Sequence, residues 1–103
     1  MYDEIHLTGF KKFGKITVNP TELIVDELTS SPIPQVHPTK LDVTVDEVNN
    51  YISSKVKEQC ESGKKTLNLH FGVGPNKEYF LENCAYNNKD FRIPDNSGKQ
   101  CQK

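Results

Sequence analysis

The chain has 103 residues, with 13 lysines and arginines against 14 aspartates and glutamates, and a formal net charge of -1. A chain of this length holds at most one domain. The balanced charge argues against a dedicated nucleic-acid-binding protein, which would carry an excess of basic residues. Hydrophobic residues make up 34 % of the sequence. We therefore expect the chain to fold around a small core.

No apolar run approaches the roughly 20 residues that a membrane-spanning helix needs. The acidic start MYDEIHLTGF lacks the basic and apolar regions of a secretory signal. The three cysteines, Cys60, Cys84 and Cys101, are odd in number and far apart, which disfavours a disulfide framework or a zinc site. We expect a cytoplasmic protein that has neither a metal nor another cofactor and binds neither nucleic acid nor a membrane.

The first two predicted elements are a strand and a helix. Residues 4–8 (EIHLT) alternate apolar and polar side chains and indicate a strand. Asn19 is a favourable helix N-cap, Pro20 suits the first helical position, and Glu22 stands at the spacing of a capping box. The sequence therefore predicts a helix over residues 20–29.

The same order of elements follows in the middle of the chain. Residues 35–41 favour a second strand, and Thr44 and Glu47 repeat the capping-box spacing ahead of a helix over 45–61. Gly63 is placed to end that helix. The apolar positions of this helix are expected to share one face: Val45, Val48, Ile52 and Val56.

Residues 66–71 (TLNLHF) predict a third strand, and residues 81–86 a further extended segment. Alternating strands and helices are typical of an α/β fold, here a three-layer α/β/α sandwich with a mostly parallel sheet. Residues 1–103 would form one domain that is only part of a larger sandwich, with a polar tail from about residue 97.

Ligands of such sheets bind at the carboxyl ends of the strands, which directs attention to the loops 9–18 and 72–80. The turn Gly72-Val73-Gly74 resembles the start of a phosphate-binding loop, but Lys77 stands where the third glycine belongs. A tight turn that lets the backbone approach another group is the stronger interpretation.

Two aromatic side chains and two charged ones are the other candidates. Phe10 and Phe13 either pack beneath the first loop or form an apolar slot for a small flat ring. Glu82 is either a surface carboxylate or the group that orients a catalytic histidine. Arg92 precedes a turn, and it is either a functional basic residue or an ordinary solvated arginine.

Two blocks of the sequence resemble the pyroglutamyl peptidase I family. The first is TGFKKFG at residues 8–14, followed by Asn-Pro at 19–20. The second begins with HFGVG at 70–74, continues to Glu82 and ends with RIPDNSG at 92–98. The two blocks stand in the family's order and span nearly the whole chain.

The resemblance implies a cytosolic cysteine peptidase that removes pyroglutamate from the amino terminus of peptides. Its triad is glutamate, cysteine and histidine, and the cysteine thiolate forms an acyl-enzyme that water hydrolyses. Glu82 matches the triad glutamate, which orients the histidine. Arg92 matches an arginine near the reacting centre, where it would assist the oxyanion.

The resemblance also implies how the substrate is held. Phe10 and Phe13 match the phenylalanines that sandwich the five-membered lactam ring. Gly72 and Val73 fall where backbone groups approach the substrate. An apolar slot suits this uncharged ring and rejects a free amino terminus, whose charge would lose its water.

The family's cysteine nucleophile and its histidine belong to a later region than any residue matched here. None of Cys60, Cys84 and Cys101 stands in the family's nucleophile motif. The sequence thus resembles the amino-terminal half of such a peptidase, and we expect the chain alone to be inactive. The alternative is a non-catalytic fragment that binds or regulates a full-length relative, or associates with itself, through an open sheet edge.

Overall fold

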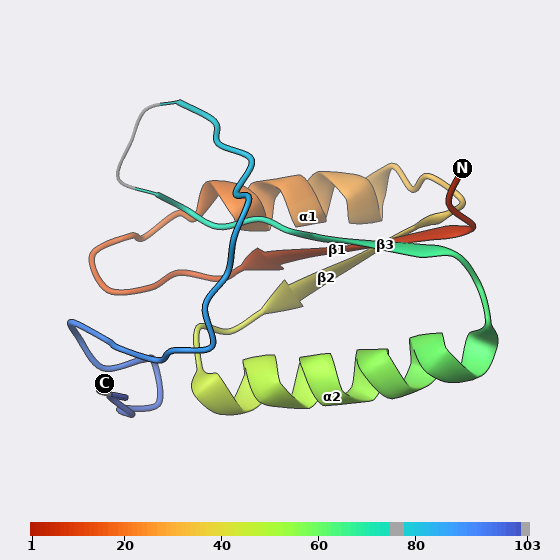
Figure 1. The fold of residues 1–103 in the computed structure, drawn as a ribbon. Helices are drawn as coiled ribbons and strands as arrows, with labels where there is room; N and C mark the ends of the chain where they lie inside the picture. Colours follow the sequence, from red (N-terminus) through yellow and green to blue (C-terminus); the bar gives the residue numbers. More distant parts are fainter. Residues whose placement is uncertain (75–77, 102–103) are drawn as a thin grey trace.

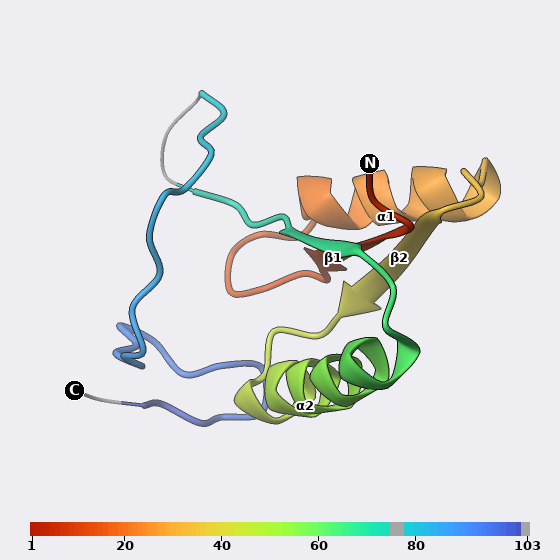
Figure 2. The same cartoon turned by 45° about the vertical axis from the view of Figure 1, so that its right-hand side comes forward.

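The computed structural model describes residues 1–74 and 78–101 and has the predicted α/β architecture. Three parallel strands form one sheet in the order β2-β1-β3. Helices α1 and α2 lie on opposite faces of this sheet (Figures 1 and 2). In chain order the elements are β1 (Glu4–Phe10), α1 (Pro20–Ser30), β2 (Val36–Leu41), α2 (Val45–Ser62) and β3 (Thr66–His70).

The element boundaries agree with the sequence to within two residues. The largest difference is at β1, which continues to Phe10 because Gly9 and Phe10 still pair with Lys40 and Leu41 of β2. Residues 81–86, expected as a further extended segment, belong to no helix or strand and are exposed. None of the helices in the described ranges is long and apolar enough to cross a membrane.

The helix caps follow the sequence signals in most respects. Asn19 caps α1, but its side-chain oxygen accepts from the N–H of Thr21 at 3.0 Å, two residues into the motif. Thr44 caps α2 and accepts from the N–H of Glu47 at 3.1 Å, the spacing of a capping box. Gly63 ends α2 in the left-handed region, with φ 66°, a conformation that favours glycine.

The two faces of the sheet differ in polarity. Because side chains alternate along a strand, Leu7 and Gly9 face α1, where Val25 is only 3 % exposed. The opposite face, toward α2, is largely polar. It carries His6 stacked on His37, with ring centroids 4.9 Å apart, and these two residues are direct partners in the β1–β2 register.

The polar face changes how α2 packs. The apolar positions Ile52 and Val56, expected to share one face of the helix with Val45 and Val48, do not pack against the sheet, since they are 42 % and 55 % exposed. Tyr51 and Gln59 lie toward the sheet instead, and Gln59 exchanges two hydrogen bonds with Asn68 of β3, of 2.8 and 3.0 Å. The sheet offers polar groups to this helix, and Gln59 can satisfy them whereas a valine cannot.

The apolar core is correspondingly small. Among the described residues, Leu7, Val25 and Leu41 are the buried hydrophobic side chains. The radius of gyration is 14.6 Å, against about 13 Å for a compact domain of about 100 residues. Residues 78–90 are all exposed and run outside the layers (Figure 1). These large apolar side chains of that segment face solvent: Tyr79, Phe80, Leu81 and Tyr86.

Candidate functional site

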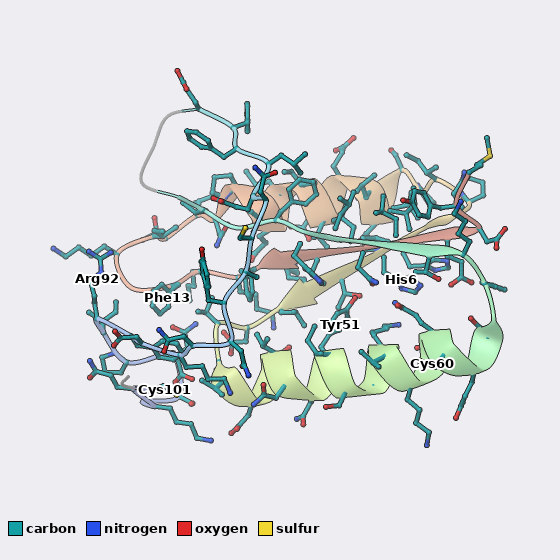
Figure 3. All side chains as sticks on the ribbon, in the orientation of Figure 1. His6, Phe13, Tyr51, Cys60, Arg92 and Cys101 are labelled. Atoms are coloured by element: carbon teal, nitrogen blue, oxygen red, sulfur yellow. The ribbon has the colours of Figure 1, made fainter. Side chains whose placement is uncertain are left out.

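An apolar pocket of about 660 Å³ lies where β1 and β2 end and α2 begins. This is the carboxyl edge of the parallel strands, where α/β proteins bind ligands. Phe13 and Arg92 lie at this end of the molecule, whereas His6 and Tyr51 lie between the sheet and α2 (Figure 3). The lining residues are Phe10, Phe13, Val43, Thr44, Val45, Val48, Asn49, Lys89, Phe91, Arg92, Ile93 and Asp95.

Phe10 is fixed in this wall by the first turn of α1. Its N–H donates to the hydroxyl of Thr21 at 2.7 Å, and that hydroxyl also lies 2.8 Å from the side-chain oxygen of Asn19. The amide group of Asn19 donates in turn to the carbonyl of Lys11 at 3.1 Å. The Asn-Pro-Thr segment therefore caps a helix and also holds the backbone on both sides of the Phe10 carbonyl.

Phe13 stands in a tight turn of the first loop. Its backbone exchanges two hydrogen bonds with Ile16, of 3.2 and 2.9 Å. Gly14 allows this turn because its φ is +56°, where other residues are strained. A Cβ atom on Gly14 would lie 3.6 Å from the Cδ1 atom of Ile93, so the loop of Phe13 abuts the segment that carries Arg92.

Asp95 joins that segment to α2. Its carboxylate is 9 % exposed and accepts from the N–H of Val45 at 2.8 Å, at the start of the helix. It also accepts from the N–H and hydroxyl of Ser97, at 2.9 and 2.8 Å, and from the N–H of Lys99 at 2.9 Å. The Val45 N–H is the strongest influence in lowering the pKa of Asp95 to about 2 from 3.8.

Asn96 joins the same segment to two loops. Its amide group donates to the carbonyl of Lys12 at 2.9 Å and to the carboxylate of Asp42 at 2.9 Å. Its N–H donates to the carbonyl of Val43, also at 2.9 Å. One side chain thus links the loop of Phe13 to the turn between β2 and α2.

The two charged candidates lie in different surroundings. Arg92 lines the pocket, is exposed, and takes part in none of the ion pairs within residues 1–74 and 78–101. Its guanidinium is therefore available to a ligand. Glu82 is exposed and is not among the residues that line the pocket. The structure brings Phe10, Phe13 and Arg92 together and leaves Glu82 outside their pocket.

Residues 72–74, expected as a tight turn after β3, are irregular backbone with no assigned turn in the described part of the chain. Gly72, Val73 and Gly74 are exposed, and a Cβ atom on either glycine would meet nothing within 4 Å. Neither glycine has a positive φ. Lys77, which stands at the third-glycine position of the phosphate-loop hypothesis, lies outside the described residues.

Among the described residues, no cysteine is hydrogen-bonded to a histidine. Cys60, Cys84 and Cys101 are free thiols. His6 lies 2.9 Å from the Glu4 carboxylate, and His70 bonds through Nδ1 to the Thr8 hydroxyl at 2.7 Å. In the described ranges, no group of three or more His, Cys, Asp and Glu side chains could hold a metal ion.

Arg92 is predicted from its motif, whereas Asp95 and Asn96 are not predicted as site residues from the sequence. An Asp-Asn pair is typical of a turn whose side chains bond only to nearby backbone, and Asp95 does accept from the N–H of Ser97 in this manner. Its partner Val45 is fifty residues away. The position of Asp95 in the RIPDNSG motif, and the cap Thr44 just before Val45, were the available signals.

A family model described as pyroglutamyl peptidase matches residues 3–103. The chain belongs to the pyroglutamyl peptidase family. The resemblance carried by the TGFKKFG and RIPDNSG blocks is thereby confirmed.

Several curated relatives are named pyrrolidone-carboxylate peptidase. The chain is 31 % identical over 102 residues to the pyrrolidone-carboxylate peptidase of Pyrococcus furiosus, covering 96 % of the chain and 47 % of that protein. It is 38 % identical over 97 residues to the enzyme of that name from Coprothermobacter proteolyticus, covering 93 % and 46 %. The match to the Vibrio vulnificus protein is 32 %, covering 94 % and 45 %. The chain spans about half the length of the curated relatives it matches.

Proposed function

We propose that this chain supplies the pyroglutamate-binding part of a cysteine peptidase that removes pyroglutamate from the amino terminus of peptides. The observation that carries the proposal is the convergence of Phe10, Phe13 and Arg92 on one apolar pocket at the carboxyl edge of the sheet. Ring-binding and charge-stabilising groups are then available at the same place.

The chemistry of the pocket suits the lactam ring. Pyroglutamate is flat and uncharged, and the phenylalanine rings offer it apolar contact. A free amino-terminal residue would bring an ammonium group into a largely apolar wall and lose hydration. The carboxylate in the lining, Asp95, already accepts hydrogen bonds from Val45, Ser97 and Lys99, and is therefore a poor partner for that charge. The volume of about 660 Å³ exceeds what one ring needs, so the first peptide residues after the ring also fit.

The proposed reaction is acyl transfer. A cysteine thiolate attacks the pyroglutamyl carbonyl, the peptide bond breaks, the amine leaves with a proton from histidine, and water then hydrolyses the thioester. We assign Glu82 to the orientation of that histidine, Arg92 to the developing oxyanion, and the backbone of Gly72 and Val73 to the substrate. The cysteine and histidine would come from outside these 103 residues.

Ligand binding tests the proposal directly. Titration of the chain with pyroglutamyl-alanine, followed by NMR, should perturb the signals of Phe10 and Phe13. Prolyl-alanine has the same ring size but carries a charged ring nitrogen, and should perturb them far less. Phe13→Ala should weaken pyroglutamyl-alanine binding, whereas Phe80→Ala, an exposed ring outside the pocket, should not. Equal binding of the two dipeptides would refute the proposed function.

The exposed surface next to β3 favours a second candidate, a non-catalytic fragment that docks on a relative or on itself. Within the described sheet, β3 pairs on one side with β1, and Phe80 and Leu81 beyond it are exposed. Unpaired strand edges beside apolar surface associate readily. Sedimentation of the chain alone and with a full-length relative tests this candidate. A chain that stays monomeric alone and does not bind the relative would exclude it.

We also propose that the protein works in the cytoplasm. Three free cysteines, two of them exposed, are compatible with a compartment that keeps thiols reduced. Fractionation of cells that make the protein would test this.

A further inference from the structure

We propose that Asp95 and Asn96 act together as positioning residues that hold the three walls of the pyroglutamate pocket in register. The inference rests on the proposed function, since it says how that pocket keeps its shape. Neither side chain needs to touch the reacting atoms. Their action is to fix the places of Phe13 and Arg92 relative to α2.

Asp95 links the first two walls. One wall is the segment 91–95, which carries Arg92, and the other is the start of α2 with Val45. The carboxylate receives a backbone N–H from the helix and two from its own turn, as well as the Ser97 hydroxyl. Its negative charge also lies at the positive end of the α2 dipole. The lowered pKa of Asp95, about 2, is the expected result of so many donors.

Asn96 links the third wall. The carbonyl of Lys12, directly before Phe13, accepts from its amide group, and so does Asp42 in the turn between β2 and α2. Within the described residues, Phe13 belongs to no strand, and its backbone pairs with Ile16 of the same loop. The bond to Asn96 therefore fixes the loop of Phe13 to the rest of the pocket.

The arrangement has the properties of a positioning device. Three segments from distant parts of the sequence meet at two adjacent side chains. The bonds between segments reach Val45, which lines the pocket, and Lys12 and Asp42, which are next to the lining residues Phe13 and Val43. A pocket on loops loses affinity when its walls shift, and a displacement of about 1 Å can lower activity on the order of 100-fold. Substitution of either side chain should thus alter ligand binding out of proportion to its effect on folding.

The test compares Asp95→Asn and Asn96→Ala with Gly63→Ala. Asp95→Asn keeps the size of the side chain but turns an NH₂ group toward the N–H groups of Ser97 or Val45. Gly63→Ala strains the opposite end of α2, where φ is +66°, and destabilises the fold without touching the pocket. Affinity for pyroglutamyl-alanine is measured by NMR at a temperature at which all variants are folded.

We expect both pocket variants to bind about tenfold or more weakly, and Gly63→Ala to bind like the wild type. A second readout needs no ligand: the nuclear Overhauser contact between Gly14 and the Ile93 methyl, which the 3.6 Å approach predicts, should weaken in Asn96→Ala and persist in Gly63→Ala. If Asp95→Asn fails to fold, the Overhauser contact in Asn96→Ala still tests the inference.

The outcomes separate the two proposals. If the wild type does not distinguish pyroglutamyl-alanine from prolyl-alanine, the proposed function fails and this inference fails with it. If the wild type binds selectively but Asn96→Ala retains both full affinity and the Gly14–Ile93 contact, the inference alone is overturned. Affinity losses in Gly63→Ala equal to those of the pocket variants would also overturn it, because stability would then explain the effect.

Discussion

The backbone of Gly9 on β1 passes so close to Thr21 on α1 that a Cβ atom on Gly9 would lie 2.4 Å from the Thr21 carbonyl oxygen. This approach brings the Thr21 hydroxyl within 2.7 Å of the N–H of Phe10. Position 9 therefore requires glycine for steric reasons. The close approach that glycine permits also places the ring of the neighbouring Phe10 in the pocket.

Gly9→Ala should destabilise the fold and weaken ligand binding together. The added methyl group meets backbone at 2.4 Å and the Val25 side chain at 2.8 Å, so β1 and α1 must separate. Overpacking of this kind costs about 1–3 kcal/mol, and thermal unfolding should shift down by about 4–8 °C per kcal/mol. Gly72→Ala is the matched control, since its Cβ atom meets nothing within 4 Å, and an equal loss of stability there would contradict the argument.

Asn19→Ala should destabilise the chain more than Thr44→Ala. Both residues are N-caps, and loss of a cap costs about 1 kcal/mol. Thr44 accepts one bond, from Glu47, but Asn19 is buried and also bonds to the Thr21 hydroxyl and the Lys11 carbonyl. Urea unfolding of the two variants measures the difference. Equal midpoints would mean that the loop bonds of Asn19 add nothing to stability.

The Glu4 carboxylate should make stability fall in acid. Its hydrogen bond with Lys64, at 2.9 Å, and then its bond with His6 lower its pKa to about 2 from 4.5. A carboxyl group with a lowered pKa in the folded state stabilises it above the unfolded-state pKa. That contribution is therefore present above about pH 4.5 and is lost as the pH falls toward about 2.

The variant Glu4→Gln tests this by removing the titrating group. Its melting temperature should depend less on pH between about 4.5 and 2 than that of the wild type. Asp95 titrates in the same range and keeps some pH dependence in the variant. Added salt should reduce the effect of Glu4, because Lys64 is exposed and the pair is screened. Identical pH profiles for the variant and the wild type would refute the role of Glu4.

The sequence predicts the elements well because their signals are local. The Asn19 and Thr44 caps, the Gly63 terminator and the alternation in β1 and β3 each involve residues close in sequence. The packing of α2 is less local. Its apolar periodicity suggests an apolar partner, but the sheet presents His6 and Asn68 to the helix, and the sequence of the helix does not encode that partner.

The candidate site shows the same limit. Phe10, Phe13 and Arg92 were chosen from their motifs, and the structure gathers them around one pocket. The bonds from Asp95 to Val45 and from Asn96 to Lys12 span 50 and 84 residues, and no local pattern encodes such pairings. The catalytic assignment of Glu82 stays a prediction.

The chain alone should not hydrolyse pyroglutamyl substrates. Within the described residues, the histidines with side-chain hydrogen bonds use them on Glu4 and Thr8, and His37 stacks on His6. Cysteine peptidases need the thiolate and its base to act as a unit, so loss of that pair removes most of the rate enhancement. Release of a fluorescent amine from a pyroglutamyl amide should match the rate in buffer. Turnover that a thiol blocker stops and Cys84→Ser abolishes would contradict this.

Addition of the separately expressed carboxyl-terminal half of a relative should restore turnover if Glu82 and the pocket belong to a peptidase. Glu82→Gln should lower the restored activity, but by about two orders of magnitude less than a nucleophile variant of the added half, because an orienting group contributes less than the nucleophile. Glu78→Gln is the matched control, an exposed carboxylate four residues earlier, and should keep full activity. If Glu82→Gln does not change the turnover, Glu82 is not part of the triad. The ring-binding role of Phe10 and Phe13 is not tested by this result and depends on the dipeptide titration.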